Sequence, residues 1–436
     1  MPSSAGPGAP PPAPPAPADP VAARARAALD RLAGDQRRIG IALSGGGDST
    51  ALMHLAHGWA QGRVLMAATV DHGLRPASGD EARAAGRAAA GLGIAHEILP
   101  WRRGAQDAPA EGGHNLMAAA REARLGLLAG WARRHGLGAV LLGHTMDDQA
   151  ETLLMRLARG AGVDGLAAMA PAREAHGLRW LRPLLDLRRA ELRVWLGARG
   201  IGWIEDPSNE DPGYERVRIR RLLADPALSA EGLALAAANL AMARDALCEI
   251  ASRSAAGAEA PRGALALPLA AFRDAPAEIR RRLLVAGVRL VTGAVYPPRR
   301  AAVLAAMAAL EGGARCTLDG VLVGPRADRL WLTREAAAAL RAPPIRPDAA
   351  GEAIWDRRWH LAGLAPGHQV AALGPDDLPP GPDLRAAGLG RDEAAASPAI
   401  RVAGRLVAAP LLRPAPGITL RPLRGLGEFH ALIHPE

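Results

Sequence analysis

The sequence predicts an α/β fold with a doubly wound parallel sheet, followed by a helical domain and a small C-terminal module that contains β-structure. From about residue 38 to residue 225, short apolar runs alternate with segments of helical character. The apolar runs are nearly continuous, as in strands that are buried on both faces. Beyond residue 221, Ala, Leu and Arg recur at helical spacing. Helices should therefore cover both faces of the sheet, and ligands are expected at the carboxyl ends of its strands.

The elements of the α/β region follow from this alternation. The expected strands cover about 40–44, 64–70, 95–100 and 139–143, with 178–183 as a further candidate. The expected helices between them cover 48–60, 80–92 and 115–135.

Changes in composition divide the chain into four segments. Residues 1–20 are rich in Pro and Ala and are expected to form a disordered tail, without the basic start and apolar core of a secretory signal. The α/β domain covers 21–225, a helical domain 226–312, and the β-containing module 313–436. Within that module, 314–335 is expected to form a hairpin or a small meander.

The charge of the chain favours a polyanionic partner. Its 436 residues carry a formal net charge of +9, and all 53 basic residues are arginines. The absence of lysine excludes a Walker A loop and a ligase that carries adenylate on an active-site lysine. The two cysteines, Cys248 and Cys316, form no C-x-x-C pair, which argues against a zinc ribbon and fits a reducing cytoplasm. No apolar run is long enough to span a bilayer.

A glycine-rich loop follows the first predicted strand and leads into a helix. It consists of Ser44, Gly45, Gly46, Gly47, Asp48 and Ser49. Glycines let the backbone approach a phosphate closely, and the helix N-terminus favours its negative charge. The serines add hydroxyl donors, and Asp48 can hold a magnesium ion. A glycine turn with a helix cap is the alternative, but the complete hexapeptide at this junction favours nucleotide binding.

Polar residues also follow the second predicted strand. Asp71, His72 and Arg75 lie where a doubly wound sheet places ligand contacts. A single histidine is more often structural, so the interpretation of His72 depends on its neighbours. Ser78 and Glu81 have the spacing of a capping box for the next helix.

Three carboxylates follow the strand at 139–143. Asp147 and Glu151, and likewise Asp148 and Glu151, have the spacing of residues that share one helix face. Such a group can bind an amine or magnesium. The alternative is an acidic first turn that complements the helix dipole, with Thr145 as the cap.

Four arginines lie close together near the end of the α/β region: Arg216, Arg218, Arg220 and Arg221. Such spacing usually gives a solvated helix face. Beside a nucleotide site, the same arginines can also bind phosphates.

Taken in order, these blocks resemble the tRNA(Ile)-lysidine synthetases of the PP-loop superfamily. The matching stretches are SGGGDS, VDHGLR, GHTMDDQAET, RPLL at 182–185, and DPSN with the arginines that follow. The resemblance covers about 38–223 and implies a fold like that of the adenine nucleotide alpha hydrolases. It also implies that 21–225 is the ATP-binding catalytic domain and that 226–312 contacts tRNA.

The resemblance further implies ligation of free L-lysine to the 2-position of the wobble cytidine in CAU-anticodon tRNA(Ile). ATP is the co-substrate, the base is adenylated, and the products are lysidine, AMP and pyrophosphate. The enzyme would be cytoplasmic, with no membrane partner; its oligomeric state is open, and a homodimer is one option.

The resemblance assigns roles to particular residues. Ser44, Gly45, Gly46, Gly47, Asp48, Ser49 and His72 bind ATP, and Asp48 holds Mg²⁺. Asp148 and Glu151 bind lysine. The expected catalytic residues are Asp48, Asp148, Glu151, Arg124 and Arg216.

Two positions depart from the family pattern, which usually has a second His at Thr145 and an Asn at Val217. They keep a catalytically silent protein with the same fold among the alternatives. Independently of them, another PP-loop enzyme is the nearest alternative, either a tRNA thiolase or an amide-forming synthetase. Cytidine thiolases typically use C-x-x-C pairs, which this chain lacks. A catalytically silent RNA-binding protein with the same fold is the alternative from another class.

Overall fold

The computed structural model describes residues 19–73, 77–101, 114–205, 215–225 and 227–434. The chain divides into two compact units, Met1–Ala241 and Met242–Pro435, and the boundary between them falls within helix α9 (Ala230–Ser254). Nearly all of the predicted tail lies outside the described residues. Helix α1 (Pro20–Ala33) begins at the last residue of the predicted tail, and the Asp19 carboxylate accepts the Ala22 N–H at 2.9 Å as an N-cap, so these two residues belong to the folded unit.

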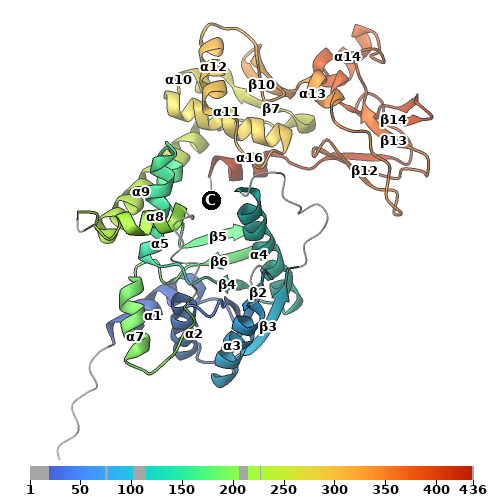
Figure 1. Cartoon of the computed structure of the whole chain (residues 1–436). Coiled ribbons are helices and arrows are strands. Elements are labelled where there is room, and N and C mark those ends of the chain that lie inside the picture. Colours follow the sequence, from blue (N-terminus) through green and yellow to red (C-terminus); the bar gives the residue numbers. More distant parts are fainter. Residues whose placement is uncertain (1–18, 74–76, 102–113, 206–214, 226, 435–436) are drawn as a thin grey trace, which may run out of the picture. The chain divides into compact units, whose positions relative to one another are not determined.

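The first unit contains the predicted doubly wound sheet (Figure 1). Its strands are β1 (Arg38–Ala42), β2 (Val64–Asp71), β3 (Ala95–Pro100), β4 (Ala139–Leu141), β5 (Ala172–Ala175) and β6 (Leu178–Leu181). Their order is β3-β2-β1-β4-β6-β5, and every pairing is parallel except that of β5 with β6. The predicted fold class and the five predicted strands are confirmed, whereas β5 was not predicted.

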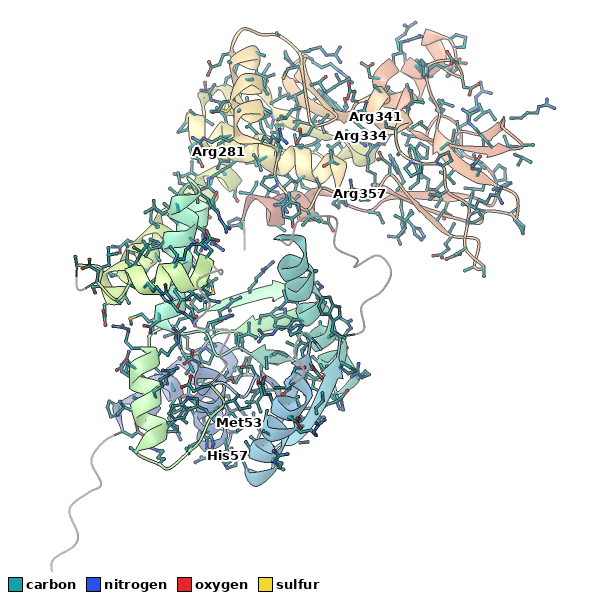
Figure 2. All side chains as sticks on the ribbon, in the orientation of Figure 1. Met53, His57, Arg281, Arg334, Arg341 and Arg357 are labelled. Carbon is teal, nitrogen blue, oxygen red and sulfur yellow. The ribbon has the colours of Figure 1, made fainter. Side chains whose placement is uncertain are left out.

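Helices cover both faces of the sheet. Besides α1, the helices of this unit are α2 (Gly47–Trp59), α3 (Ser78–Gly91), α4 (His114–Arg134), α5 (Met146–Ala158), α6 (Val163–Leu166), α7 (Arg189–Gly197) and α8 (Glu215–Leu222). Ile41 belongs to a core with α1, α2, α3 and α7, whereas its neighbour Ala42 belongs to a second core with α4. Met53 of α2 is buried in the first core, and His57, one turn later, is exposed (Figure 2).

The strand order reverses at β1, which fixes the place of the site. β2 and β3 lie on one side of β1, and β4 and β6 lie on the other. Loops that leave the carboxyl ends of β1 and β4 therefore diverge, and a crevice at this switch point is the usual ligand site of such sheets.

The second unit begins with helices that pack on an antiparallel sheet. The helices are α10 (Leu269–Asp274), α11 (Ala277–Thr292) and α12 (Arg300–Glu311), and the sheet has the order β7 (Leu265–Pro268), β10 (Arg329–Arg334), β9 (Val321–Arg326), β8 (Cys316–Leu318). The meander predicted at 314–335 is confirmed. Strand β7 lies inside the segment predicted to be helical and pairs with β10.

The remainder of this unit is built from two three-stranded antiparallel sheets. They comprise β11 (Ala353–Trp355), β12 (Trp359–Ala362) and β16 (Thr419–Pro422), and β13 (Gln369–Ala372), β14 (Pro398–Val402) and β15 (Arg405–Ala408). The short helices are the 3-10 turn η3 (Pro261–Gly263), α13 (Ala336–Leu340), α14 (Gly381–Ala386), α15 (Arg391–Ala395) and α16 (Leu426–Ile433). The expected β-structure is thus confirmed.

This unit also has a pocket of about 560 Å³, whose lining includes Arg334, Arg341 and Arg357 (Figure 2). Within the described part of the chain, no helix is both long and apolar enough to cross a membrane.

Candidate active site

The glycine loop has the predicted strand–loop–helix geometry. Strand β1 ends at Ala42, and α2 begins at Gly47 with Gly46 as its N-cap. Gly45 has φ of +83°, a conformation that favours glycine, and a Cβ there would lie 2.6 Å from Ile204 Cδ1. The loop therefore presents backbone amides at a helix N-terminus, which is an arrangement that binds phosphate.

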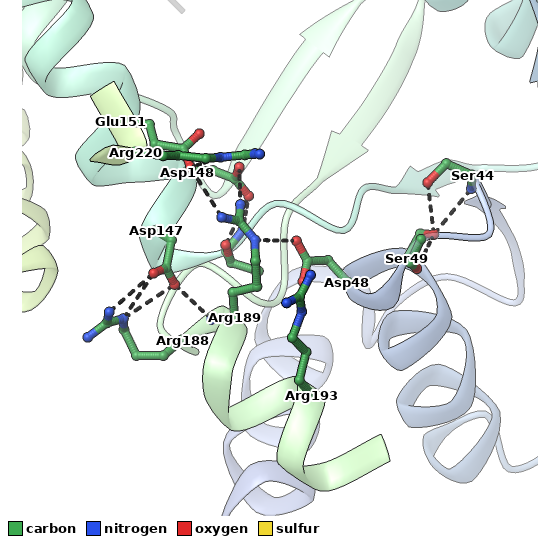
Figure 3. Close-up of polar contacts among 12 residues, drawn as sticks. Ser44, Asp48, Ser49, Asp147, Asp148, Glu151, Arg188, Arg189, Arg193 and Arg220 are labelled. Carbon is green, nitrogen blue, oxygen red and sulfur yellow. Dashed lines mark hydrogen bonds and ion pairs between the residues drawn. The ribbon is translucent and has the colours of Figure 1, made fainter. Parts of the chain in front are cut away.

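Hydroxyl groups from the first turn of α2 hold the loop in shape (Figure 3). The Ser44 N–H donates to Ser49 Oγ at 3.2 Å, and Ser49 Oγ donates to the Gly46 carbonyl at 3.0 Å. Thr50 Oγ1 donates to the Gly45 carbonyl at 3.2 Å. In this conformation Ser49 acts first as a support for the loop.

The block that follows β4 packs directly on this loop. A Cβ at Gly143 would lie 3.0 Å from the Ser49 backbone, so the glycine allows β4 and the start of α2 to approach closely. This contact explains why a glycine precedes the acidic residues of α5, and it brings them next to the glycine loop.

Asp48 is a partly buried acid, with a side chain that is 22% exposed. Its Oδ2 accepts a hydrogen bond from Arg189 Nε at 3.0 Å, whereas Oδ1 is buried without a partner among the described residues. Burial raises the pKa of Asp48, and the Arg189 guanidinium opposes this effect. An unpartnered carboxylate oxygen beside the glycine loop fits Mg²⁺, which is usually held by one or two carboxylates together with substrate phosphates.

Asp148 and Glu151 are buried on the first turns of α5, with 5% and 0% exposure. Asp148 Oδ2 accepts the Thr145 N–H at 2.7 Å and the Thr145 hydroxyl at 2.9 Å. The capping interpretation is therefore correct for this oxygen. The other oxygen, Oδ1, faces arginines, so Asp148 serves both as a cap and as part of a charged site.

Three guanidiniums neutralise these acids. Arg189 bridges Asp48, Asp148 and Glu151, while Arg216 and Arg220 of α8 approach from the other side. Arg216 Nη2 lies 2.6 Å from Asp148, and Arg220 Nε lies 2.7 Å from Glu151. We call the three acids and three arginines the ion-pair cluster: Asp48, Asp148, Glu151, Arg189, Arg216 and Arg220.

Asp147 lies apart from the ion-pair cluster, although the sequence placed it with Glu151. It pairs with Arg188 at 3.2 Å and accepts the backbone N–H of Arg189 at 2.7 Å (Figure 3). Its carboxylate thus ties the N-terminus of α7 to α5, which is favourable because a helix N-terminus attracts negative charge.

The carboxyl end of β2, next to β1, holds a second group of predicted residues. His72 makes an edge-on contact with Trp101, with ring centroids 5.7 Å apart, and its Nδ1 is buried without a partner among the described residues. Burial lowers the pKa of His72, and nearby Arg124 lowers it further. Both effects favour the neutral form of the imidazole, and the ATP-binding role of His72 stays a prediction. Arg75 and the D-P-S-N turn lie outside the described residues.

The predicted capping box at the start of α3 is not formed. The helix begins at Ser78 with Ala77 as its N-cap and without a side-chain cap bond. Ser78 instead hydrogen-bonds the Asp71 carboxylate and, together with the Gly73 N–H, lowers the pKa of Asp71. The Ser78 hydroxyl thus bonds Asp71 at the end of β2 in place of a backbone N–H of the helix.

The sequence interpretation missed Arg189 and gave no role to Arg182, which begins the RPLL stretch. Arg182 is 7% exposed and donates to His144 Nδ1 at 3.3 Å and to the Ala170 carbonyl at 2.7 Å. One sequence feature could have identified both arginines: they follow β6, and residues that follow parallel strands lie at the edge of the sheet where ligands are expected. Val217 is buried on α8 with Ile219, so this departure from the family pattern is compatible with packing.

The fold and the glycine loop define a class, the PP-loop ATP-binding proteins. The family described as "PP-loop domain" matches residues 19–227. The tRNA(Ile)-lysidine synthase of Ruegeria pomeroyi is 45% identical over 408 residues, which are 91% of this chain and 94% of that protein. That of Methylobacterium sp. (strain 4-46) is 41% identical over 311 residues, covering 68% and 88%. The chain belongs to the tRNA(Ile)-lysidine synthase family.

A solved structure shows a more distant likeness. It is the U34-tRNA thiolase NcsA from Methanococcus maripaludis, with 17% identity and a TM-score of 0.42 over 50% of this chain and 76% of that one.

Proposed function

We propose that this chain ligates free L-lysine to the 2-position of the wobble cytidine of CAU-anticodon tRNA(Ile), at the expense of ATP. The observation that carries the proposal is the junction of two sites: Asp48 of the phosphate loop and the buried acids Asp148 and Glu151 share one guanidinium. A nucleotide site and an amine site thus meet at the switch point of the sheet. Membership of the family supports the same conclusion.

In the first step, the glycine-loop amides and the α2 N-terminus hold the phosphates of ATP. The cytosine O2 attacks the α-phosphorus, the new O–P bond forms, and the bond to the bridging oxygen of pyrophosphate breaks. Such a step gains chiefly from positioning and from stabilised charge, which fixed amides and guanidiniums supply. Asp48 Oδ1 would hold Mg²⁺, whose charge would favour the phosphates.

In the second step, the ε-amine of lysine attacks C2 of the adenylated base, and AMP leaves. Asp148 and Glu151 bind the incoming ammonium ion. Because neighbouring carboxylates raise the pKa of an amine, the ammonium must lose a proton before it attacks. We assign these two acids recognition of lysine first, with one of them accepting that proton.

The target base must leave the stacked anticodon loop to reach this site. The net charge of +9, which is carried by arginines, favours the tRNA backbone as a partner. In this proposal 21–225 is catalytic, 226–312 contacts tRNA, 313–436 is the accessory module, and the enzyme acts in the cytoplasm. Whether it is a homodimer is decided by light scattering on the purified chain.

The test is incorporation of radiolabelled lysine into unmodified CAU-anticodon tRNA(Ile), with ATP and magnesium. Initiator methionine tRNA shares the anticodon and serves as the control. Label confined to tRNA(Ile), and lost in Asp48→Ala, is the expected result. A protein that binds ATP yet gives no label would refute lysidine synthesis, and a lack of ATP–pyrophosphate exchange with tRNA present would favour a silent RNA-binding protein.

A further inference from the structure

Arg189 lies where the two halves of the proposed site meet. Each nitrogen of its guanidinium contacts a different acid: Nε is 3.0 Å from Asp48, Nη2 is 2.9 Å from Asp148, and Nη1 is 3.2 Å from Glu151 (Figure 3). The planar fork of arginine suits such multiple pairing, which a point charge cannot reproduce. Arg189 is therefore paired at the same time with Asp48 of the glycine loop and with Asp148 and Glu151, the two acids of the proposed amine site.

The other two arginines of the ion-pair cluster have a narrower reach. The contacts of Arg216 are with Asp148 and Glu151, and that of Arg220 is with Glu151. Within the cluster, it is Arg189 that extends these contacts to Asp48. A ligand that changes the state of Asp48 thus acts on the amine site through this side chain.

We propose that Arg189 is a positioning residue that makes lysine binding depend on prior nucleotide binding; this inference rests on the proposed function. Without nucleotide, its guanidinium takes the place of the lysine ammonium on Asp148 and Glu151. When metal and nucleotide engage Asp48, Arg189 loses one of three partners and gains the phosphates as an alternative. Its guanidinium then turns toward them, and the lysine ammonium ion takes its place on the two acids beside Arg216 and Arg220.

The local structure allows such a movement without a change in the backbone. The Arg189 N–H is held by Asp147 Oδ2 at 2.7 Å, at the first residue of α7. The Arg189 side chain is 20% exposed, so it is not fully enclosed by its neighbours. Only side-chain torsions need to change, and the anchored backbone returns the guanidinium to the acids when the nucleotide leaves.

The consequence is a thermodynamic coupling that can be measured without catalysis. We expect α,β-methylene ATP with MgCl₂ to tighten lysine binding to the full chain by about tenfold or more, and lysine to tighten binding of the nucleotide by the same factor. Equilibrium dialysis with radiolabelled lysine measures the first factor, and calorimetric titration of the nucleotide measures the second.

The decisive variant is Arg189→Gln, which keeps hydrogen-bonding capacity and removes the charge. Because the internal competitor is gone, lysine should bind this variant more tightly without nucleotide than it binds the wild type. The effect of nucleotide on lysine affinity should fall to within about twofold. A misfolded protein cannot give such a gain in affinity. Arg189→Lys, which keeps a cation without the fork, should restore part of the coupling.

The matched control is Arg220→Gln, which removes another guanidinium from Glu151 but no contact to Asp48. Its lysine affinity should change equally with and without nucleotide, so that the coupling factor stays at the wild-type value. Wild-type coupling in Arg189→Gln, or equal loss of coupling in both variants, would overturn the inference. If the wild type still makes lysidine, the proposed function survives that result; if the wild type neither binds lysine nor makes lysidine, both fail.

Discussion

Replacement of Gly45 by alanine should destabilise the first unit while leaving its architecture intact. Its φ of +83° costs an L-residue roughly 1–2 kcal/mol, and the new Cβ would lie 2.6 Å from Ile204 Cδ1. That atom is the end of a flexible side chain, and moving it off its rotamer adds about 0.5–1.5 kcal/mol. The expected loss is therefore about 1.5–3.5 kcal/mol, and a unit of this size loses roughly 2–4 °C of melting temperature per kcal/mol.

Two matched glycines separate the backbone requirement from the ligand requirement. Gly46 has φ of −70°, and the nearest atom to its Cβ position is Ser44 Oγ at 3.7 Å. Gly46→Ala should thus change stability by less than about 0.5 kcal/mol, yet weaken nucleotide binding because the methyl group occupies the approach to the loop amides. Gly58→Ala, in α2 with no atom within 4 Å, should stabilise by about 0.5–1 kcal/mol.

Calorimetric unfolding of the three variants measures stability, and titration with α,β-methylene ATP and MgCl₂ measures binding. The expected pattern is that Gly45→Ala loses both, Gly46→Ala loses binding alone, and Gly58→Ala loses neither. Wild-type melting of Gly45→Ala would show that the left-handed conformation is dispensable. Wild-type binding by Gly46→Ala would refute the idea that these amides hold phosphate.

Three further predictions concern charges elsewhere in the two units. Glu151→Gln should cost about 3–5 kcal/mol in urea unfolding, because it removes the charge of a fully buried carboxylate that pairs with three arginines. Asp147→Asn should cost about 1–2 kcal/mol, and equal losses would contradict the geometry. Asp356→Asn should cost the second unit about 3 kcal/mol in thermal unfolding, because the buried Arg358 would lose its ion pair with Asp356 at 3.6 Å. Burial already lowers the pKa of Arg358 to about 10. An unchanged melting temperature would show that the Asp356 charge is not needed. Because the pKa of His72 is lower in the folded chain, the unfolded chain binds a proton at this histidine at a higher pH than the folded chain does. The contribution of His72 to stability is therefore present above a pH of about 6.5 and is lost as the pH falls. Melting temperatures measured from pH 7.5 to 5.5 should decline less steeply in His72→Asn, and an identical slope would show that this imidazole is not the group responsible.

The strands that the sequence predicted are those whose burial is encoded locally. Residues of β1 and β4 are buried on both faces, and their apolar runs show this directly. The edge strand β5 reads AREA, and three of its four residues are exposed, so only its pairing with β6 makes it a strand. Strand β7 resembles the helices around it, and its pairing with β10 lies about sixty residues ahead in the sequence.

The candidate site divides along the same line. The glycine loop and the acids of α5 are contiguous motifs with a local chemical meaning. Arg189 has none, because its contact with Asp48 joins residues 141 positions apart, and it is one of 53 arginines in a chain without lysine. Composition hides such a residue, and only the strand order that brings β1, β4 and β6 together reveals it.

The charges of the ion-pair cluster follow from the two substrates that it would have to accept. Exposed acids would repel a nucleotide triphosphate, and exposed guanidiniums would repel a lysine ammonium ion. Paired with one another, three carboxylates and three guanidiniums have no formal net charge, so neither substrate meets a repulsive site. In the proposed exchange, the phosphates would take the Arg189 guanidinium, and the lysine ammonium ion would take its place on Asp148 and Glu151. A buried ion pair of this kind adds little stability compared with apolar packing. Its value to the protein would then lie in the exchange, which requires the arginine that connects the nucleotide acid to the amine acids.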